Sequence, residues 1–158
     1  MQNLQGKHRM DDRIKEAKQK ALSLLNYMDR TELQLRQKLK EKSFEDEVID
    51  EAINYVKSFG YINDVGYAER YILNKQASKS KREIYASLSQ KGINREDIEC
   101  AMEHCYEAED ELATLHRLCE KKHFVAGEAT DAEKKRMYQY LLRKGFRGEE
   151  ICKVLNVQ

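Results

Sequence analysis

The segment SLSQKGINREDI, residues 87–98, has two counterparts elsewhere in the chain: KLKEKSFEDEVI at 38–49 and YLLRKGFRGEEI at 140–151. In each copy a Leu is followed three residues later by Lys, then by Gly or Ser, then by an apolar residue, and five residues further on by Ile. The leucines stand 49 residues apart (39 to 88) and then 53 residues apart (88 to 141). A period of this length is typical of stacked helical units, so the sequence predicts a tandem array.

The Lys-Gly-apolar part of the pattern is a signal for the end of a helix. Gly92 and Gly145 can take the left-handed backbone conformation that closes a last helical turn, and the apolar residue that follows can pack back on that turn. The preceding Lys sits where a cation is favoured by exposed helix carbonyls. Ser43 stands at the glycine position of the first copy and must adopt the same conformation with a Cβ. We therefore interpret the motif as mainly structural.

Composition narrows the fold class. The chain has 158 residues, of which 36% are charged, with no Pro, no Trp and seven Gly. This composition favours long helices over β architectures that are rich in turns. In a repeat array each unit contacts mainly its neighbours, so the core spreads along an axis. We predict an all-α protein in which three tandem three-helix repeats form an elongated, curved array.

Apolar periodicity and capping residues divide the chain. The clearest amphipathic stretch starts near residue 12, and good N-cap residues stand at Thr31, Asn63 or Asp64, and Ser80. The prediction is a flexible N-terminus followed by three repeats, with the bounds 1–11, 12–60, 61–106 and 107–158.

Hydropathy and cysteine content indicate the cellular compartment of the protein. No apolar run approaches the ~18 residues of a membrane span, and the first residues lack the apolar core of a signal peptide. Four cysteines without paired short spacings fit a reducing compartment better than a disulfide framework. We expect a cytoplasmic monomer with no membrane partner and no disulfide bridges.

Charge is segregated along the chain. The formal net charge of +1 conceals middle helices that are net basic and closing helices that are acidic in the first two units. Stacking in register would align the basic helices in one stripe that suits a charged, elongated partner, whereas a solvated surface of mixed charge is the alternative. The candidate residues for contact with a partner or with DNA are Arg36, Lys38, Lys42, Lys79, Lys81, Arg82, Lys91, Lys134, Lys135, Arg136, Arg143 and Lys144.

Nine tyrosines raise the question of base stacking. Most of them fall near apolar helical faces, so packing in the core or at its rim is the expected role. Tyr85 and Tyr138 are the best candidates for exposed platforms on which single-stranded bases stack.

A metal site is the competing chemistry. His116, Cys119 and His123 stand at i, i+3 and i+7 on one predicted helix, and His104 lies four residues from Cys100 on the preceding one. The repeat alignment places Cys100 opposite exposed positions, which disfavours the site. The sequence also lacks a phosphate loop, a His-Glu-x-x-His motif and a dinucleotide fingerprint. We therefore predict no catalytic residue, no metal and no cofactor, and expect a protein that is not an enzyme.

Four runs of the chain share a known pattern: ALSLLNYMDRTELQLRQKLKEKSF (21–44), KSFGYINDVGYAERYILNKQ (57–76), SKREIYASLSQKGINREDIECAM (80–102) and KKRMYQYLLRKGFRGEEICKVL (134–155). The most specific features are the turn Gly60-Tyr61-Ile62-Asn63-Asp64, followed by Ala68, and the spaced Lys-Gly-apolar endings. In these features the chain resembles the RecX family of bacterial regulatory proteins, from about Ala17 to Leu155. It departs from the pattern at Ser43, where Gly is usual, and in the second repeat, where Ser80 and Glu83 replace a usual Gly-x-x-Arg.

The resemblance implies three tandem three-helix repeats and binding to the filament of the RecA recombinase. RecX-like proteins are expected to restrain filament assembly and thereby inhibit ATP hydrolysis, strand exchange and coprotease activity, within DNA repair, homologous recombination and the SOS response. The residues leave one alternative open: a helical module that binds single- or double-stranded DNA without a recombinase partner.

Overall fold

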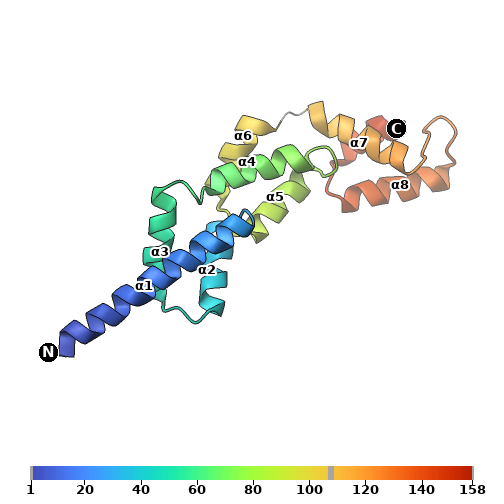
Figure 1. The fold of residues 1–158 in the computed structure, drawn as a ribbon. Coiled ribbons are helices and arrows are strands. Elements are labelled where there is room, and N and C mark those ends of the chain that lie inside the picture. Colours follow the sequence, from blue (N-terminus) through green and yellow to red (C-terminus); the bar gives the residue numbers. More distant parts are fainter. Residues whose placement is uncertain (1, 107–108, 158) are drawn as a thin grey trace.

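The computed structural model of the protein describes residues 2–106 and 109–157, and over these residues it contains helices and connections but no strand (Figure 1). The all-α prediction is confirmed. None of these helices is long and apolar enough to cross a membrane. In chain order they are α1 (Gln2–Tyr27), α2 (Glu32–Glu41), α3 (Asp46–Ser58), α4 (Asp64–Lys75), α5 (Lys81–Gln90), α6 (Arg95–Cys105), α7 (Glu109–Lys121), α8 (Asp131–Arg143) and α9 (Gly148–Leu155).

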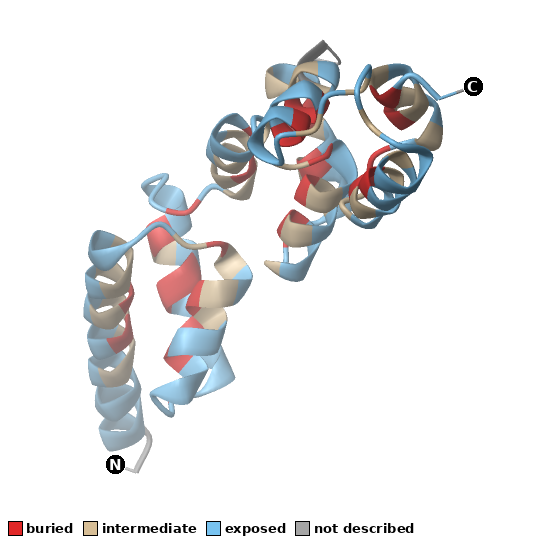
Figure 2. Ribbon diagram, turned by 90° about the vertical axis from the view of Figure 1, so that its right-hand side faces the viewer, coloured by how far each residue is buried: buried red, intermediate tan, exposed pale blue. Residues whose placement is uncertain are grey.

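The helices pack in three consecutive groups, each with its own hydrophobic core. Helix α1 packs on α2 and α3, α4 packs on α5 and α6, and α9 packs on α7 and α8. We call these groups the first, second and third unit. They follow one another along an elongated, curved molecule, and the buried residues line the inner helix faces (Figures 1 and 2). The centres of the three cores include Leu35, Leu39 and Ile53, then Ile72, Ile84 and Leu88, then Leu115, Leu141 and Ile151.

Helix α1 is longer than the sequence predicted. It begins at Gln2 and not near residue 12, so residues 2–11 are helical; residue 1 lies outside the described residues. The prediction relied on apolar periodicity, whereas residues 4–12 are exposed and have no core to face. Their good helix formers extend the helix without packing. Packing begins at Arg13, whose guanidinium lies 4.5 Å from the centre of the Phe44 ring.

The Lys-Gly-apolar motif ends each middle helix as predicted. At the end of α5, Gly92 has a φ of 87° and its N–H donates to the Ser89 carbonyl, while the Ile93 N–H donates to the Leu88 carbonyl over 3.2 Å. This pair of bonds is a Schellman motif, in which the two apolar residues also meet. The same bonds close α2 and α8 around positions 43 and 145, where φ is 66° and 95°.

The two later copies require glycine for a second reason. A Cβ built on Gly92 would lie 2.4 Å from Cδ2 of Leu33, and one on Gly145 would lie 2.8 Å from Oγ of Ser80. In both cases the obstructing side chain belongs to the preceding unit. Ser43 is exposed and meets only the backbone requirement, which explains why the first copy tolerates a side chain at this position.

We predict that Gly92→Ala lowers the free energy of unfolding by about 2–5 kcal/mol, because a left-handed backbone strain of about 1–2 kcal/mol is joined by the collision with Leu33. Urea unfolding followed by far-ultraviolet circular dichroism measures the change. The matched control is Gly60→Ala, since Gly60 has a φ of 72° and open space around its Cβ position. The control should lose only the strain contribution of about 1–2 kcal/mol. Equal losses in both variants would contradict the role of the close approach.

Candidate functional site

Two buried hydroxyl groups join the units. The hydroxyl of Thr31 donates to the Lys91 carbonyl over 2.6 Å, and the hydroxyl of Ser80 donates to the Lys144 carbonyl over 2.6 Å. Neither Thr31 nor Ser80 is exposed to solvent. We call the contact at Thr31 the first junction and the contact at Ser80 the second junction.

Each of these hydroxyls also caps a helix. The Thr31 hydroxyl accepts from the Gln34 N–H and the Ser80 hydroxyl from the Glu83 N–H, so α2 and α5 begin at these residues. The N-terminus of α2 therefore meets the C-terminus of α5, and the N-terminus of α5 meets the C-terminus of α8. The three middle helices are joined end to end, with the positive end of one dipole facing the negative end of the next.

Further polar contacts surround both junctions. At the first, the Asp64 carboxylate accepts from the Glu32 N–H over 3.0 Å, and Arg70 pairs with Asp29 at 2.7 Å. At the second, the Thr114 hydroxyl donates to the Gln76 carbonyl over 2.5 Å. The junctions are thus largely hydrogen-bonded, whereas the three units are held by apolar cores.

Each junction includes a partly buried carboxyl group with a perturbed pKa. Burial raises the pKa of Asp64 at the first junction, although the hydrogen bond from the Glu32 N–H opposes this shift. Burial also raises the pKa of Glu111 at the second junction, against the effect of Arg147 and of a hydrogen bond from Tyr106. In both cases loss of water destabilises the charged form more than the neighbours stabilise it.

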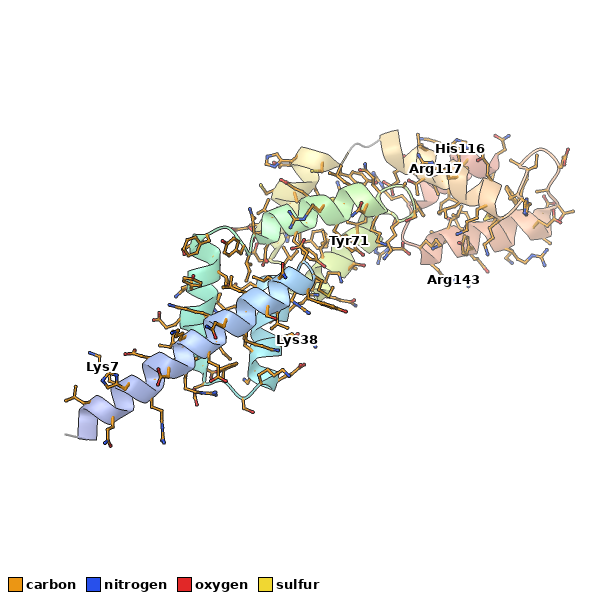
Figure 3. The ribbon with its side chains drawn as sticks, viewed as in Figure 1. Lys7, Lys38, Tyr71, His116, Arg117 and Arg143 are labelled. Atoms are coloured by element: carbon orange, nitrogen blue, oxygen red, sulfur yellow. The ribbon has the colours of Figure 1, made fainter. Side chains whose placement is uncertain are left out.

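The predicted basic residues lie on or beside the middle helices, but two of them are neutralised. Arg36 pairs with Asp50 of α3 at 2.6 Å, and Lys38 pairs with Glu41 at 3.4 Å. Figure 3 shows Lys38 on α2 and Arg143 on α8, in the first and third units. Among the described residues, no carboxylate lies within 4.0 Å of the other ten candidates, namely Lys42, Lys79, Lys81, Arg82, Lys91, Lys134, Lys135, Arg136, Arg143 and Lys144.

The prediction for Tyr85 and Tyr138 is wrong. Both side chains are partly buried and pack against the cores of their units. The most exposed tyrosines are Tyr27 at 82% and Tyr61 at 54%, and the Tyr61 ring stacks on Phe59 with 5.6 Å between centroids. The position of Tyr61 just after the helix-ending Gly60 indicated a turn, but its exposure depends on tertiary packing.

The alternative metal site is not assembled. Among the described residues there is no group of three His, Cys, Asp or Glu side chains that suits a metal ion. His104 lies 3.2 Å from Glu69 of its own unit, His116 lies on α7 (Figure 3), and Cys119 is buried in the third core, where burial raises the pKa of its thiol. All four cysteines are free.

Three helical units joined end to end through their middle helices make this chain an all-α tandem-repeat protein. Comparison with family models identifies each unit: the RecX first three-helix domain matches residues 17–55, the second matches 63–102 and the third matches 109–155. The chain belongs to the RecX family.

Relatives and solved structures agree with this assignment. The chain is 38% identical over 144 residues to the regulatory protein RecX of Caldanaerobacter subterraneus subsp. tengcongensis, covering 90% of this chain and 71% of the relative. It is 33% identical to RecX of Clostridium perfringens strain SM101, covering 86% of this chain and 65% of the relative. The crystal structure of RecX from Lactobacillus salivarius superposes with a TM-score of 0.77 at 28% identity, over 92% of this chain and 96% of that one. These relatives are regulatory proteins.

We predict that Thr31→Val destabilises the protein more than Thr130→Val. Both residues cap a helix within the same kind of capping box, and losing the cap costs about 1 kcal/mol in each case. Of the two, only Thr31 is buried against another unit. Its loss therefore also leaves the Lys91 carbonyl without this donor, which lowers the free energy of unfolding by about a further 1–3 kcal/mol. Urea unfolding of both variants measures the difference. Equal losses would show that the hydrogen bond at the first junction contributes nothing.

We predict that Asp64→Asn stabilises the protein at pH 7 relative to Asp131→Asn, the matched change at the first residue of α8. A raised pKa means that the stability contributed by protonated Asp64 is present below its unfolded value of 3.8 and is lost as pH rises through the folded value. Asn keeps the oxygen that accepts from Glu32 and never ionises.

The advantage of Asp64→Asn should therefore fade as the pH falls below about 4. Thermal unfolding at a series of pH values from 3 to 8 measures it. A constant difference across this series would contradict the role of ionisation.

Proposed function

We propose that the chain binds the filament of the RecA recombinase and inhibits its assembly, and with it ATP hydrolysis, strand exchange and coprotease activity. The observation that carries this proposal is membership of the RecX family of regulatory proteins through all three domains, in order, over residues 17–155. The role belongs to DNA repair, homologous recombination and the SOS response.

The geometry of the array supports a filamentous partner. A filament presents equivalent sites at regular intervals, and an elongated array can contact adjacent subunits at once. Linked contacts of this kind strengthen one another through their high effective concentration. An inhibitor that bridges subunits would hinder the movements that growth and turnover require. In this proposal the chain acts as a cytoplasmic monomer and performs no catalysis.

The candidate contact surface consists of the ten predicted cations, from Lys42 to Lys144, that pair with no carboxylate of the described residues. Such side chains suit an acidic protein surface or the phosphates of the strand inside the filament. Long-range attraction of this kind accelerates association and weakens as salt rises.

A helical module that binds nucleic acid without a recombinase is the second candidate, favoured by the same cations. The two candidates differ in an assay of DNA-dependent ATP hydrolysis by RecA with substoichiometric amounts of this chain. Inhibition below one chain per RecA subunit supports the filament inhibitor. Unchanged hydrolysis, together with tight DNA binding that weakens with salt, supports the second candidate.

We predict that the triple variant Lys134→Glu, Lys135→Glu and Arg136→Glu on α8 requires at least tenfold more protein for half-maximal inhibition of RecA. Three charge reversals replace attraction by repulsion at the contact surface. Titration of the ATPase assay measures the change, and circular dichroism checks that helicity is kept.

The matched control carries three reversals at exposed positions of α1, namely Lys7, Arg9 and Lys15. It has the same net charge as the α8 variant and should inhibit like the wild type. If the α8 variant inhibits as well as this control, the cations of α8 are not part of the contact surface.

A further inference from the structure

A groove at the first junction has an unusual lining. Its walls are polar side chains of two different units together with one leucine, and none of them is a carboxylate. Leu33, Gln34 and Gln37 come from α2 of the first unit, and the second unit supplies Tyr71, Lys79, Ser87, Gln90 and Lys91.

Two ammonium groups flank one aromatic ring in this groove. Lys79 Nζ donates to the Tyr71 hydroxyl over 3.2 Å and lies 5.8 Å from the centre of the ring. Lys91 Nζ lies 5.7 Å from the same centre. Both lysines are partly buried, and no carboxylate of the described residues lies within 4.0 Å of either. Two like charges held beside one ring favour an anion between them.

The charges of Lys79 and Lys91 also affect the pKa of Tyr71. Burial of this side chain opposes its ionisation, yet hydrogen bonds with Ser87 and Lys79 and the charges of Lys79 and Lys91 lower its pKa below the ordinary value. Figure 3 labels Tyr71 in the second unit. The groove therefore stabilises negative charge on an oxygen that it holds. A phosphate oxygen has that charge already.

We propose that this groove binds a phosphate group of a nucleic-acid strand. Lys79 and Lys91 supply the cations, and the hydroxyl of Tyr71 supplies a neutral donor. Charge-assisted hydrogen bonds of this kind are the main protein contacts to phosphates, and they carry no sequence information. The inference deepens the proposed function, because it assigns the strand of the filament, rather than the recombinase, to one named site.

A second pair of lysines flanks another tyrosine ring, but its surroundings suit a phosphate less well. Lys122 and Lys144 lie 4.8 and 5.5 Å from the centre of the Tyr140 ring. The cavity that Lys122 and Tyr140 line also contains Glu128 and Glu133, whose carboxylates repel a phosphate. The groove at the first junction is therefore the better phosphate site of the two.

The position of the groove gives the ligand a mechanical effect. Because α2 contributes one wall and the second unit the other, a bound phosphate contacts both sides of the first junction. Binding then adds a connection beside the hydrogen bond from Thr31 to the Lys91 carbonyl. The amides at the N-terminus of α2 should exchange hydrogen more slowly when the strand is bound.

The test uses the full chain and a fluorescein-labelled oligodeoxythymidylate, without recombinase, and follows anisotropy from 50 to 200 mM NaCl. The variant Lys79→Gln with Lys91→Gln removes both charges and introduces none. Each lost contact to a single strand lowers the salt slope by about 0.7, so the slope should fall by about 1.4 and the affinity at 50 mM by tenfold or more. Tyr71→Phe should weaken binding by about threefold through loss of one hydroxyl.

The control variant is Lys7→Gln with Lys15→Gln on α1, which has the same net charge. The proposal is overturned if the Lys79 and Lys91 variant matches this control in slope and affinity, or if the wild-type chain does not bind the oligonucleotide. Competition with inorganic phosphate and with ATP separates the sources of the group. Release of the strand by either one at equal phosphate concentration assigns the groove to a free phosphate or nucleotide instead.

Inhibition of RecA is measured in parallel on the same preparations. A wild-type chain that binds the strand through this groove and leaves RecA unaffected refutes the proposed function and retains the phosphate site. A chain that inhibits RecA with the control and the groove variant equally active refutes the site and retains the function.

Discussion

The architecture depends on a hydrogen bond from a helix-capping hydroxyl to the last carbonyl of the middle helix in the next unit. Thr31 and Ser80 each satisfy two orphan groups at once, the N–H of the third residue of their own helix and the terminal carbonyl of another. An unsatisfied buried group would be costly, so this contact constrains both the distance and the direction between units. The glycines at 92 and 145 allow the approach because they present no Cβ. At both junctions, one hydroxyl group therefore caps a helix, binds the end of another helix and joins two units.

The apolar cores and the polar junctions have different roles in the structure. Each apolar core holds three helices together, while the polar junctions decide how the units are placed. In a quasi-one-dimensional array the two contributions are additive to a first approximation. Junctions made of hydrogen bonds and a carboxyl group whose pKa is raised respond to solvent, salt and ligands more readily than the cores do.

Local signals in the sequence predicted much of the fold. The caps at Thr31 and Ser80, the left-handed glycines and the all-α class follow from rules that act over a few residues. The N-terminal part of α1 was missed because it is a helix without a core, which leaves no periodicity to detect. The exposure of Tyr61 and the burial of Tyr85 were missed because both depend on which unit lies nearby. The ring of Tyr71 between Lys79 and Lys91 was missed because it joins a helix, a loop and a second helix end.

Ser43 makes the end of α2 different from the ends of the other two middle helices. A helix that approached the end of α2 as α2 approaches α5 would meet the Ser43 side chain, whereas at Gly92 the missing Cβ leaves that space to Leu33. The Cβ of Ser43 therefore disfavours the approach of another helix N-terminus at this end. The presence of a side chain at this position thus separates the end of α2 from the two helix ends that receive a neighbouring unit.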